Sequence, residues 1–424
     1  MKFFVHTTGC KANQWDSHVI MNRLQEAGLS PDSLAEADVI VVNACALTEG
    51  AERDTRRFIG GLREKNGTAR IILTGCHGQI YPENSFGADT VLGQGEKFKI
   101  GEYLYKKGRF VAEATAIPMD AFGVPEPRAD KTRFFFKIQD GCDHFCSYCV
   151  VPSARGKPRS RPLPEVMEAL KILRKRGVKE VVLTGIEVSS YLDQTTGTDF
   201  KGLLRLIDEI ETPPRIRLSS VDPLYLDDEF AEILAGSAKI AKSLHIPLQS
   251  GSDKVLREMG RNYTAGYIRT VVELLLAAVD GIGIGMDVIA GFPGEGEQEF
   301  ADTVRLIETL DVYYLHVFPF SARLGTRAFA MECKVPTEVK KRRVSVLKKL
   351  DAAKRRRFCL RFIGSEAWII PEGKIYKGNF MRGYTDNYLP VYLRWNKNIE
   401  NSLIRVKIRE IQGDMLIGEV VGNP

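Results

Sequence analysis

The sequence predicts an α/β protein with three parts: an N-terminal α/β domain with a parallel sheet, a central partial (β/α)6 barrel, and a small C-terminal antiparallel β-barrel. Over the first three quarters of the chain, short apolar runs alternate with amphipathic stretches, which is typical of buried parallel strands joined by helices. Beyond residue 361, five short strand patterns are separated by glycine-containing turns. The 424 residues are also too many for one ordinary core. We therefore expect domains at 1–112, 128–358 and 361–424.

Three cysteines of the N-terminal domain follow predicted strands. Cys10, Cys45 and Cys76 each come at the end of a short β-branched run, with amphipathic helical patterns at 17–27 and 49–65 between them. Since the carboxyl ends of parallel strands share one edge of a sheet, the three thiols are expected to converge. Three converging thiolates suit an iron–sulfur cluster that keeps one iron open. Three unrelated buried cysteines are the alternative, because a free cysteine packs as a small hydrophobe.

A second cysteine trio lies on one loop near the middle of the chain. Cys142, Cys146 and Cys149 have the spacing C-x3-C-x2-C and follow the aromatic run 134–138. A structural zinc site usually closes with four protein ligands. Three thiolates on one loop instead suit a four-iron cluster whose fourth iron is free to bind something else. A zinc knuckle completed by His144 is the alternative.

The central region contains six candidate strands, fewer than the eight of a closed barrel. They are 134–139, 179–184, 215–219, 243–248, 284–290 and 312–318. Helical patterns between them include 164–176, 200–210, 264–279 and 297–310. Small and polar residues follow several strands; Gly185, for example, permits the backbone to approach a ligand closely.

These motifs resemble those of the radical S-adenosylmethionine (SAM) methylthiotransferases. The resemblance rests on the segments 8–14, 42–45 and 74–76 and on the cysteine loop, in which Tyr148 directly precedes Cys149. It extends along essentially the whole chain. It implies an open radical SAM barrel and two 4Fe–4S clusters: one held by the second cysteine trio, whose free iron binds SAM, and an auxiliary one held by the N-terminal trio.

The same resemblance implies which residues contact SAM. These residues are Tyr148, Gly185, Glu187, Arg217, Ser219 and Gln249. No catalytic residue beyond the cluster ligands is expected.

The reaction implied is the transfer of a methylthio group, from SAM and a cluster-bound sulfur, to a C–H bond by a 5′-deoxyadenosyl radical mechanism. Residues 136–142 and 315–321 look most like the branch that acts on C2 of N6-threonylcarbamoyladenosine at position 37 of tRNA. Other branches act on isopentenyladenosine at that position or on a ribosomal-protein aspartate, and both stay open as substrates. A non-catalytic iron–sulfur protein that binds RNA is the alternative from another functional class.

Positive charge is concentrated at the C-terminal end, which favours a polyanionic partner. Residues 338–424 carry a net charge of +10, whereas residues 1–337 carry −4. The five strand patterns suggest an oligonucleotide-binding (OB) type of barrel, and 383–388 resembles a loop of TRAM, a tRNA-binding module. The candidate RNA contacts are Arg155, Arg159, Arg161, Arg355, Arg356, Tyr384 and Tyr388. A solvated basic surface, and core packing of the two tyrosines, are the alternatives.

The composition is that of a cytoplasmic protein. No apolar run approaches the roughly 20 residues of a membrane span, so we expect no membrane partner. Eight cysteines without an export signal favour a reducing compartment. The expected partners are the tRNA anticodon loop, an electron donor of the reductase or flavodoxin type, and a sulfur donor.

Overall fold

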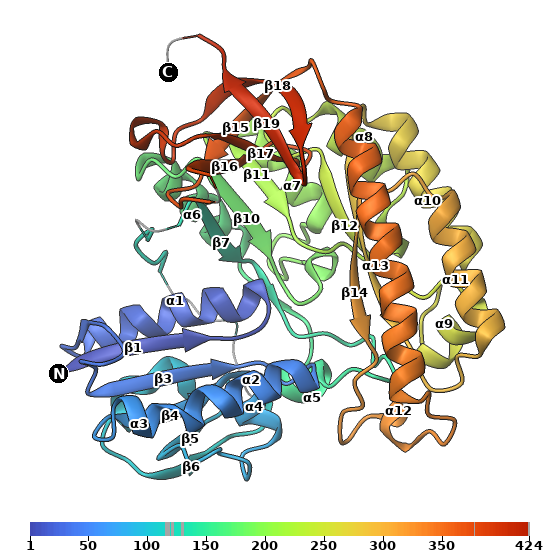
Figure 1. Ribbon diagram of the computed structural model, residues 1–424. Coiled ribbons are helices and arrows are strands. Elements are labelled where there is room, and N and C mark those ends of the chain that lie inside the picture. The colour runs from blue at the N-terminus through green and yellow to red at the C-terminus, as the bar shows by residue number, and fades with distance from the viewer. Residues whose placement is uncertain (115–118, 120–122, 129–130, 377, 423–424) are drawn as a thin grey trace.

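A computed structural model describes residues 1–114, 119, 123–128, 131–376 and 378–422 of the protein. Three sheet-based parts follow one another along the chain (Figure 1). The expected α/β fold class, with its parallel N-terminal sheet, its partial barrel and its C-terminal five-stranded barrel, is confirmed.

The N-terminal part is a wholly parallel sheet with strand order β2-β1-β3-β4-β5-β6. Its strands are β1 (Lys2–Thr7), β2 (Ser30–Pro31), β3 (Val39–Ala44), β4 (Arg70–Thr74), β5 (Thr90–Leu92) and β6 (Gly108–Phe110). Its helical segments are α1 (Lys11–Glu26), α2 (Glu49–Gly60), α3 (Leu62–Lys65), α4 (Gly75–Ile80) and the 3-10 helix η1 (Glu96–Tyr103). Val39 and Val41 pack with residues of α1, whereas Ile40 and Val42 pack with residues of α2 and α3. Both faces of the sheet are therefore covered, which explains its continuous apolar strands.

The central part has six parallel strands, in two three-stranded sheets. The strands are β7 (Arg133–Lys137), β10 (Glu180–Thr184), β11 (Arg215–Leu218), β12 (Ser243–Gln249), β13 (Gly283–Ala290) and β14 (Tyr314–Pro319). Parallel bridges from Ile216 to Ile240 and from Ser220 to His245 join the two sheets. A short antiparallel pair, β8 (Gln139–Asp140) with β9 (Arg159–Ser160), flanks the cysteine loop.

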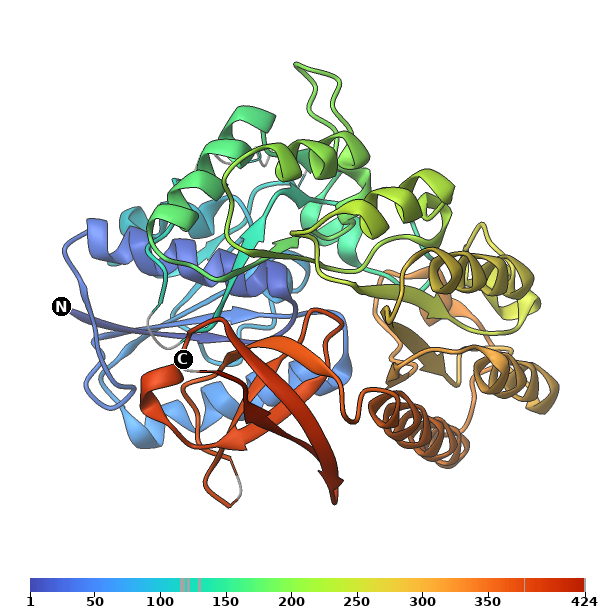
Figure 2. The same cartoon turned by 90° about the horizontal axis from the view of Figure 1, so that it is seen from above.

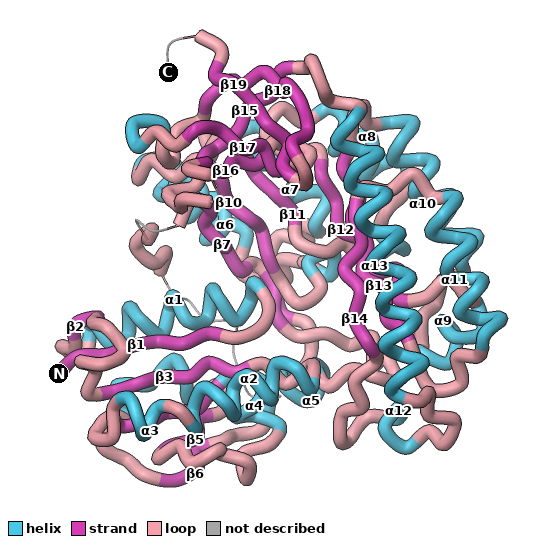
Figure 3. The backbone as a smooth tube through the Cα atoms, viewed as in Figure 1, coloured by secondary structure: helices cyan, strands magenta, loops and turns pink. Residues whose placement is uncertain are grey.

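Most helices of the central part cover the outer side of this partial barrel, whereas α5 (Val151–Arg155) lies against α4 of the N-terminal part (Figure 3). The other helices of the central part are α6 (Leu163–Lys175), α7 (Phe200–Glu209), α8 (Asp228–Gly236), α9 (Asp253–Met259), α10 (Ala265–Ala278), α11 (Glu297–Thr309), α12 (Arg327–Ala330) and α13 (Thr337–Leu360). Alternate strand residues such as Ile246, Val288 and Leu315 join the core with α10 and α11. The residues between them project to the inner face of the strands, because side chains alternate along a strand.

The C-terminal part is a closed barrel with strand order β15-β16-β17-β19-β18. Its strands are β15 (Glu366–Pro371), β16 (Phe380–Tyr384), β17 (Pro390–Arg394), β18 (Ile404–Gln412) and β19 (Met415–Val420). The pairing of β17 with β19 is parallel, so this barrel is not wholly antiparallel as expected. Viewed from above, it lies on the open side of the arc that the outer helices form (Figure 2).

The basic stretch 340–357 belongs to α13, which runs beside β14 (Figure 1). Leu347 is buried in the central core, and Val344 and Leu350 pack against that core. This helix therefore has an apolar face that packs on the central core. Within the described part of the chain, no helix has the length and apolar character needed to cross a membrane.

Candidate functional site

The structure brings the three N-terminal cysteines together at one edge of the parallel sheet. Cys10 precedes α1, Cys45 directly follows β3 and Cys76 lies in the first turn of α4. Gly9 has a φ of +100°, and a Cβ at Gly9 would lie 3.1 Å from the Cys45 Sγ. A side chain at position 9 would therefore collide with the second cysteine, and only glycine suits this turn.

Burial and the proximity of other thiols raise the pKa of two of these cysteines, Cys10 and Cys45. Burial raises the pKa of Cys10 and raises that of Cys45 to about 12; the neighbouring Cys76 raises both further, and the nearby Arg155 lowers both. Binding of an iron cluster replaces the thiol protons, so it is coupled to proton release. Hydrogen bonds of 3.4 Å already reach the sulfurs from the Leu47 backbone NH (to Cys45) and from Gln94 Nε2 (to Cys76).

Arg155 lies at the centre of a buried ion network between the N-terminal sheet and the partial barrel. Its guanidinium donates to Asp140 at 2.9 and 3.1 Å, to Asp16 at 2.9 Å, and to the Cys76 Sγ at 3.4 Å. Lys137 contacts both carboxylates, at 2.6 and 2.7 Å. Burial raises the pKa of Asp140. The positive charges of Arg155 and Lys137 outweigh this effect and hold the pKa of Asp140 well below its usual range. The expected RNA contact at Arg155 is therefore wrong, because this side chain is 0% exposed.

The other two arginines of the expected RNA-binding loop also turn inward. Arg161 is buried, pairs with Glu165 at 3.0 Å, and lies over the ring of Phe136, so an RNA contact there is wrong as well. Arg159 is half-buried, 3.4 Å from an Asp140 oxygen. It stays a candidate.

The second cysteine trio lies on a loop whose backbone is fixed at several points. The Cys142 NH donates to the Gly156 carbonyl at 3.1 Å, and the Cys149 NH donates to the Cys146 carbonyl at 3.0 Å. Gly141 has a φ of +79°, and a Cβ there would lie 2.0 Å from the Lys157 carbonyl oxygen. Burial raises the pKa of Cys142 and of Cys149 to about 12.

The helix α5 joins the two trios. The Val151 NH, at its first residue, donates to the Cys149 Sγ at 3.4 Å, and Arg155, at its last residue, donates to the Cys76 Sγ at the same distance. Ala154 packs against Cys76 between these ends. One five-residue helix therefore contacts a sulfur of each site.

Among the described residues, neither cysteine trio has the close spacing of ligand atoms that a single bound ion needs. In the described part of the chain, two groups of side chains have ligand atoms that all lie within 4.8 Å of one another, and neither contains a cysteine. A tetrahedral zinc ion draws its ligand atoms to within about 4 Å of one another. His144 groups with Glu187 and Asp222 instead, at 3.9 Å from each. The zinc knuckle completed by His144 is therefore not supported.

Most of the expected SAM contacts lie at the carboxyl ends of the strands, beside the cysteine loop. Gly185 follows β10, and a Cβ there would lie 2.7 Å from the Gln139 side chain. The absence of a side chain at position 185 therefore leaves room for Gln139. Glu187 accepts a hydrogen bond from the Ser189 NH at 3.2 Å, and burial raises its pKa. Ser219 directly follows β11, and Gln249 is the last residue of β12; both side chains are buried. Tyr148 packs against the apolar cluster that contains Phe292 and Phe320. These five positions stay candidates.

The sixth expected SAM contact, Arg217, lies away from the other five. Its guanidinium donates to Glu180 at 3.1 Å and to the backbone carbonyls of Thr385 and Asp386 at 3.0 and 2.9 Å. These bonds connect the partial barrel to the C-terminal barrel. The expected SAM contact at Arg217 is therefore wrong, because its donors are used at the other end of the strands.

The two tyrosines of the TRAM-like loop also belong to this junction. Tyr384 and Tyr388 stack with ring centroids 4.8 Å apart, and Arg133 and Arg217 lie over their rings. The Tyr388 hydroxyl accepts a hydrogen bond from Arg133 at 3.1 Å. Both side chains are only partly buried, so they stay candidates for base stacking.

The two arginines expected from the basic helix differ in their surroundings. Arg355 pairs with Asp351 at 2.8 Å and lies over the Tyr314 ring, whereas Arg356 is exposed. Both stay candidates for an RNA contact.

Comparisons with known proteins agree with this architecture. The profile of the Radical SAM superfamily matches residues 136–307, and that of the Uncharacterized protein family UPF0004 matches residues 2–93. The threonylcarbamoyladenosine tRNA methylthiotransferase MtaB of Bacillus subtilis is 36% identical over 95% of this chain and 92% of the relative. The tRNA-2-methylthio-N(6)-dimethylallyladenosine synthase of Alkalilimnicola ehrlichii is 32% identical over 99% and 98%.

The chain belongs to the radical SAM methylthiotransferases. SAM and two 4Fe–4S clusters are the cofactors of this methylthiotransferase. The radical SAM methyltransferase TsrM of Kitasatospora setae, solved with cobalamin and a 4Fe–4S cluster bound, shares the fold at a TM-score of 0.59 and 18% identity, over 77% of this chain and 76% of that chain.

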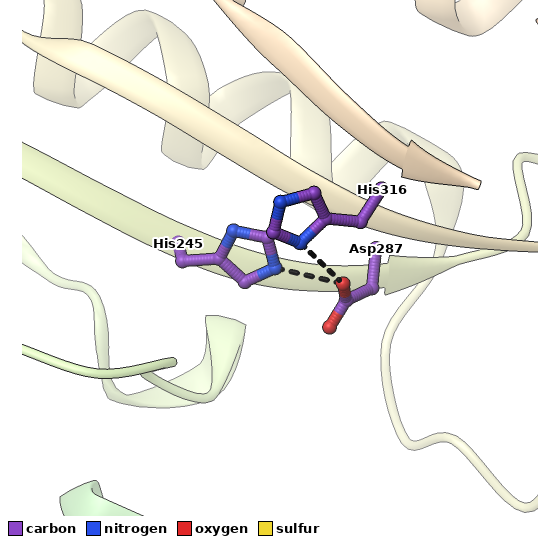
Figure 4. A group of neighbouring side chains, drawn as sticks. All are labelled: His245, Asp287 and His316. Atoms are coloured by element: carbon purple, nitrogen blue, oxygen red, sulfur yellow. Dashed lines mark ion pairs between the residues drawn. The ribbon is translucent and has the colours of Figure 1, made fainter. Parts of the chain in front are cut away.

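A third polar group lies on the inner face of the methylthiotransferase barrel, and the sequence analysis missed it. His245 of β12, Asp287 of β13 and His316 of β14 point toward one another (Figure 4). His245 Nε2 and His316 Nδ1 lie 2.9 and 3.4 Å from the same Asp287 oxygen. The available signal was one polar residue inside each of three consecutive apolar strands.

Lys11, the residue after Cys10, lies near charged residues of the barrel strands. The charged groups that act on it include Arg217, Arg133, Glu180 and Asp287, all from barrel strands. Burial, followed by the two arginines, lowers the pKa of Lys11 to about 8.

Proposed function

We propose that this methylthiotransferase inserts a methylthio group at C2 of N6-threonylcarbamoyladenosine at position 37 of tRNA. The observation that carries the proposal is the pair of three-cysteine sites joined by α5, because the reaction needs two clusters close together. The substrate rests on relatives whose names specify this nucleoside, such as those of Bacillus subtilis and Thermotoga maritima.

In this proposal each trio holds one cluster with a vacant iron. Cys142, Cys146 and Cys149 bind the cluster that anchors SAM, and Cys10, Cys45 and Cys76 bind the auxiliary cluster. The cofactors supply one-electron SAM cleavage and the transferred sulfur, which protein side chains cannot supply. The chain holds the two sites close together through α5, which contacts a sulfur of each.

The tRNA is proposed to approach over the basic C-terminal end. Phosphate contacts there would position the anticodon loop without reading its sequence. Exposed cations of α13 are available for this purpose: Lys341, Arg342, Lys348, Lys349, Arg356 and Arg357. We propose a cytoplasmic location, where a reductase or flavodoxin-type electron donor and a sulfur donor complete the reaction; the eight free cysteines suit a reducing compartment.

Nucleoside analysis tests the proposal. Cluster-reconstituted protein is reduced and incubated with SAM, a sulfide source and tRNA from cells that lack 2-methylthio modification. Mass spectrometry is expected to show loss of N6-threonylcarbamoyladenosine and a gain of its 2-methylthio derivative. Unchanged N6-threonylcarbamoyladenosine, alongside normal release of 5′-deoxyadenosine, would reject this substrate.

The alternative tRNA substrate is isopentenyladenosine, because relatives that are 32% identical carry that specificity in their names. The same digest reports it as 2-methylthio-isopentenyladenosine. A ribosomal protein added in place of tRNA tests the aspartate alternative. A non-catalytic RNA-binding protein would release no 5′-deoxyadenosine in any of these assays.

A further inference from the structure

We propose that His245, Asp287 and His316 bind one divalent transition-metal ion, of which zinc is the type, on the inner face of the partial barrel. The group lies apart from both cysteine trios, since neither of the close-set ligand groups in the described part of the chain contains a cysteine. The proposal goes beyond methylthio transfer, because it adds a further metal site to those of the two clusters.

The ligand atoms of this group have the spacing of a coordination sphere. One ligand atom from each of the three side chains lies within 4.8 Å of the other two. His245 Nε2 is 2.9 Å and His316 Nδ1 is 3.4 Å from the same Asp287 oxygen (Figure 4). A tetrahedral zinc ion with bonds of about 2.0–2.1 Å holds its nitrogen and oxygen ligands about 3.3 Å apart. Both nitrogen-to-oxygen distances are therefore close to those around a bound ion.

The register of three strands sets this spacing. Asp287 of β13 lies directly opposite His316 of β14. His245 of β12 lies opposite Gly285, two residues before Asp287 on the same strand. Because side chains two residues apart on a strand share a face, all three side chains project from one face of the sheet. A site on paired strands is held more precisely than a site on loops.

Tyr314 holds the His245 ring in the orientation that a metal ligand needs. The Tyr314 hydroxyl lies 3.1 Å from His245 Nδ1, and the other ring nitrogen, Nε2, points at Asp287. Metal-binding histidines almost always use their second ring nitrogen in such a hydrogen bond. The Tyr314 ring can lie there because residue 285 is glycine: a Cβ at Gly285 would be 2.0 Å from a ring carbon. The neighbouring strands therefore supply both the ligands and the support of one ligand.

Exposure gives an ion an entry path and an open side. The side chain of His316 is 51% exposed, that of Asp287 24% and that of His245 11%. The group therefore opens to solvent past His316. Three protein ligands leave a fourth tetrahedral position for water or for an oxygen atom of a ligand. Two imidazoles with one carboxylate favour zinc or ferrous iron over magnesium and calcium, which prefer oxygen ligands.

Metal analysis of the cluster-loaded protein tests the site. The protein is incubated with excess zinc, because this donor set binds zinc more tightly than ferrous iron. Free metal is removed on a desalting column, and bound zinc and iron are counted by mass spectrometry. Wild type is expected to retain one zinc ion per chain more than His316→Ala or Asp287→Asn.

Tyr314→Phe tests the support of His245 separately. This variant keeps all three ligands and removes the hydroxyl that bonds to His245. Its Kd for zinc, measured by competition with a chelating dye, should rise about tenfold. An unchanged Kd would contradict the role given to Tyr314.

Two controls separate loss of the ion from damage to the protein. His18→Ala removes a histidine of α1 outside the group and should retain as much zinc as wild type. The iron content of His316→Ala should equal that of wild type, because both clusters stay in place. Equal zinc in wild type and His316→Ala would show adventitious binding, and a wild type that retains no zinc would show that the group is joined by hydrogen bonds alone. Either result would overturn the site.

Discussion

At the scale of single residues, contacts with residues distant in the sequence determine several roles that the sequence left open. Arg155 belongs to a run of four cations that reads as a solvated or RNA-binding loop, yet it is buried between Asp16 and Asp140. Asp16 and Cys76 are far from it in the sequence, so no local pattern reveals the contact. The group of His245, Asp287 and His316 escaped notice for the same reason, because each residue stands alone in its strand.

Removal of the Arg155 charge should destabilise the protein strongly. Arg155→Met leaves two buried carboxylates with fewer cations, which is expected to lower the free energy of unfolding by about 3–5 kcal/mol. Urea denaturation of the cluster-loaded protein measures the loss. The matched variant Arg356→Met removes an exposed arginine and should change the value by less than about 0.5 kcal/mol. Equal effects of the two variants would contradict the buried network.

Glu180 gives the protein an acid-sensitive contact. Burial raises the pKa of Glu180, but the positive charges of three arginines outweigh burial and lower that pKa from its usual 4.5 to about 2. These arginines are Arg217, Arg215 and Arg133. The folded pKa of Glu180 is below its unfolded pKa, so its stabilisation is complete above pH 4.5 and is lost as the pH falls toward 2. Glu180→Gln should flatten the fall in urea midpoint over this range. An identical pH profile for the variant would refute the assignment.

At the scale of elements, periodicity predicted the parallel strands and the long helices well. Their apolar runs are continuous because both faces are buried, and α13 shows a regular apolar face. Contacts between elements were beyond the sequence. The convergence of Cys10, Cys45 and Cys76 followed from the shared edge of a parallel sheet. The contact between Arg217 and Tyr388 of the C-terminal barrel depends instead on how two domains meet.

The cysteine loop depends on the absence of a side chain at position 141. Gly141→Ala places a methyl group against the Lys157 carbonyl, so the loop must shift. The variant should retain about half of the iron, since only the cluster on this loop is lost. Gly177→Ala is the control, because Gly177 has a similar φ of +77° but open space around it. Full iron content in Gly141→Ala would show that the loop tolerates the shift.

At the scale of the whole molecule, the two cysteine sites and the C-terminal barrel lie at opposite ends of the barrel strands. The sites gather at the carboxyl ends, whereas Asn387 of the C-terminal barrel bonds to the Gly281 carbonyl, just before β13. The inner face between these ends carries His316. The domain limits 1–112, 128–358 and 361–424 remain predictions, which limited proteolysis would check.

Arg217 should act on domain docking and not on SAM. Arg217→Met removes its bonds to Glu180 and to the C-terminal barrel, so backbone amides of β16 and β17 should exchange hydrogen faster. The KM for SAM should change by less than about twofold, because its guanidinium points away from the cysteine loop. A tenfold rise in KM with unchanged exchange would restore the SAM contact that the sequence suggested.

The central claim is that the two trios hold separate clusters with separate tasks. The most direct test compares Cys149→Ala with Cys76→Ala, measuring 5′-deoxyadenosine and the methylthiolated nucleoside in the same reaction. Cys149→Ala should yield neither, whereas Cys76→Ala should still release 5′-deoxyadenosine and make no methylthiolated product. Methylthiolated tRNA from Cys76→Ala, or SAM cleavage by Cys149→Ala, would contradict the account.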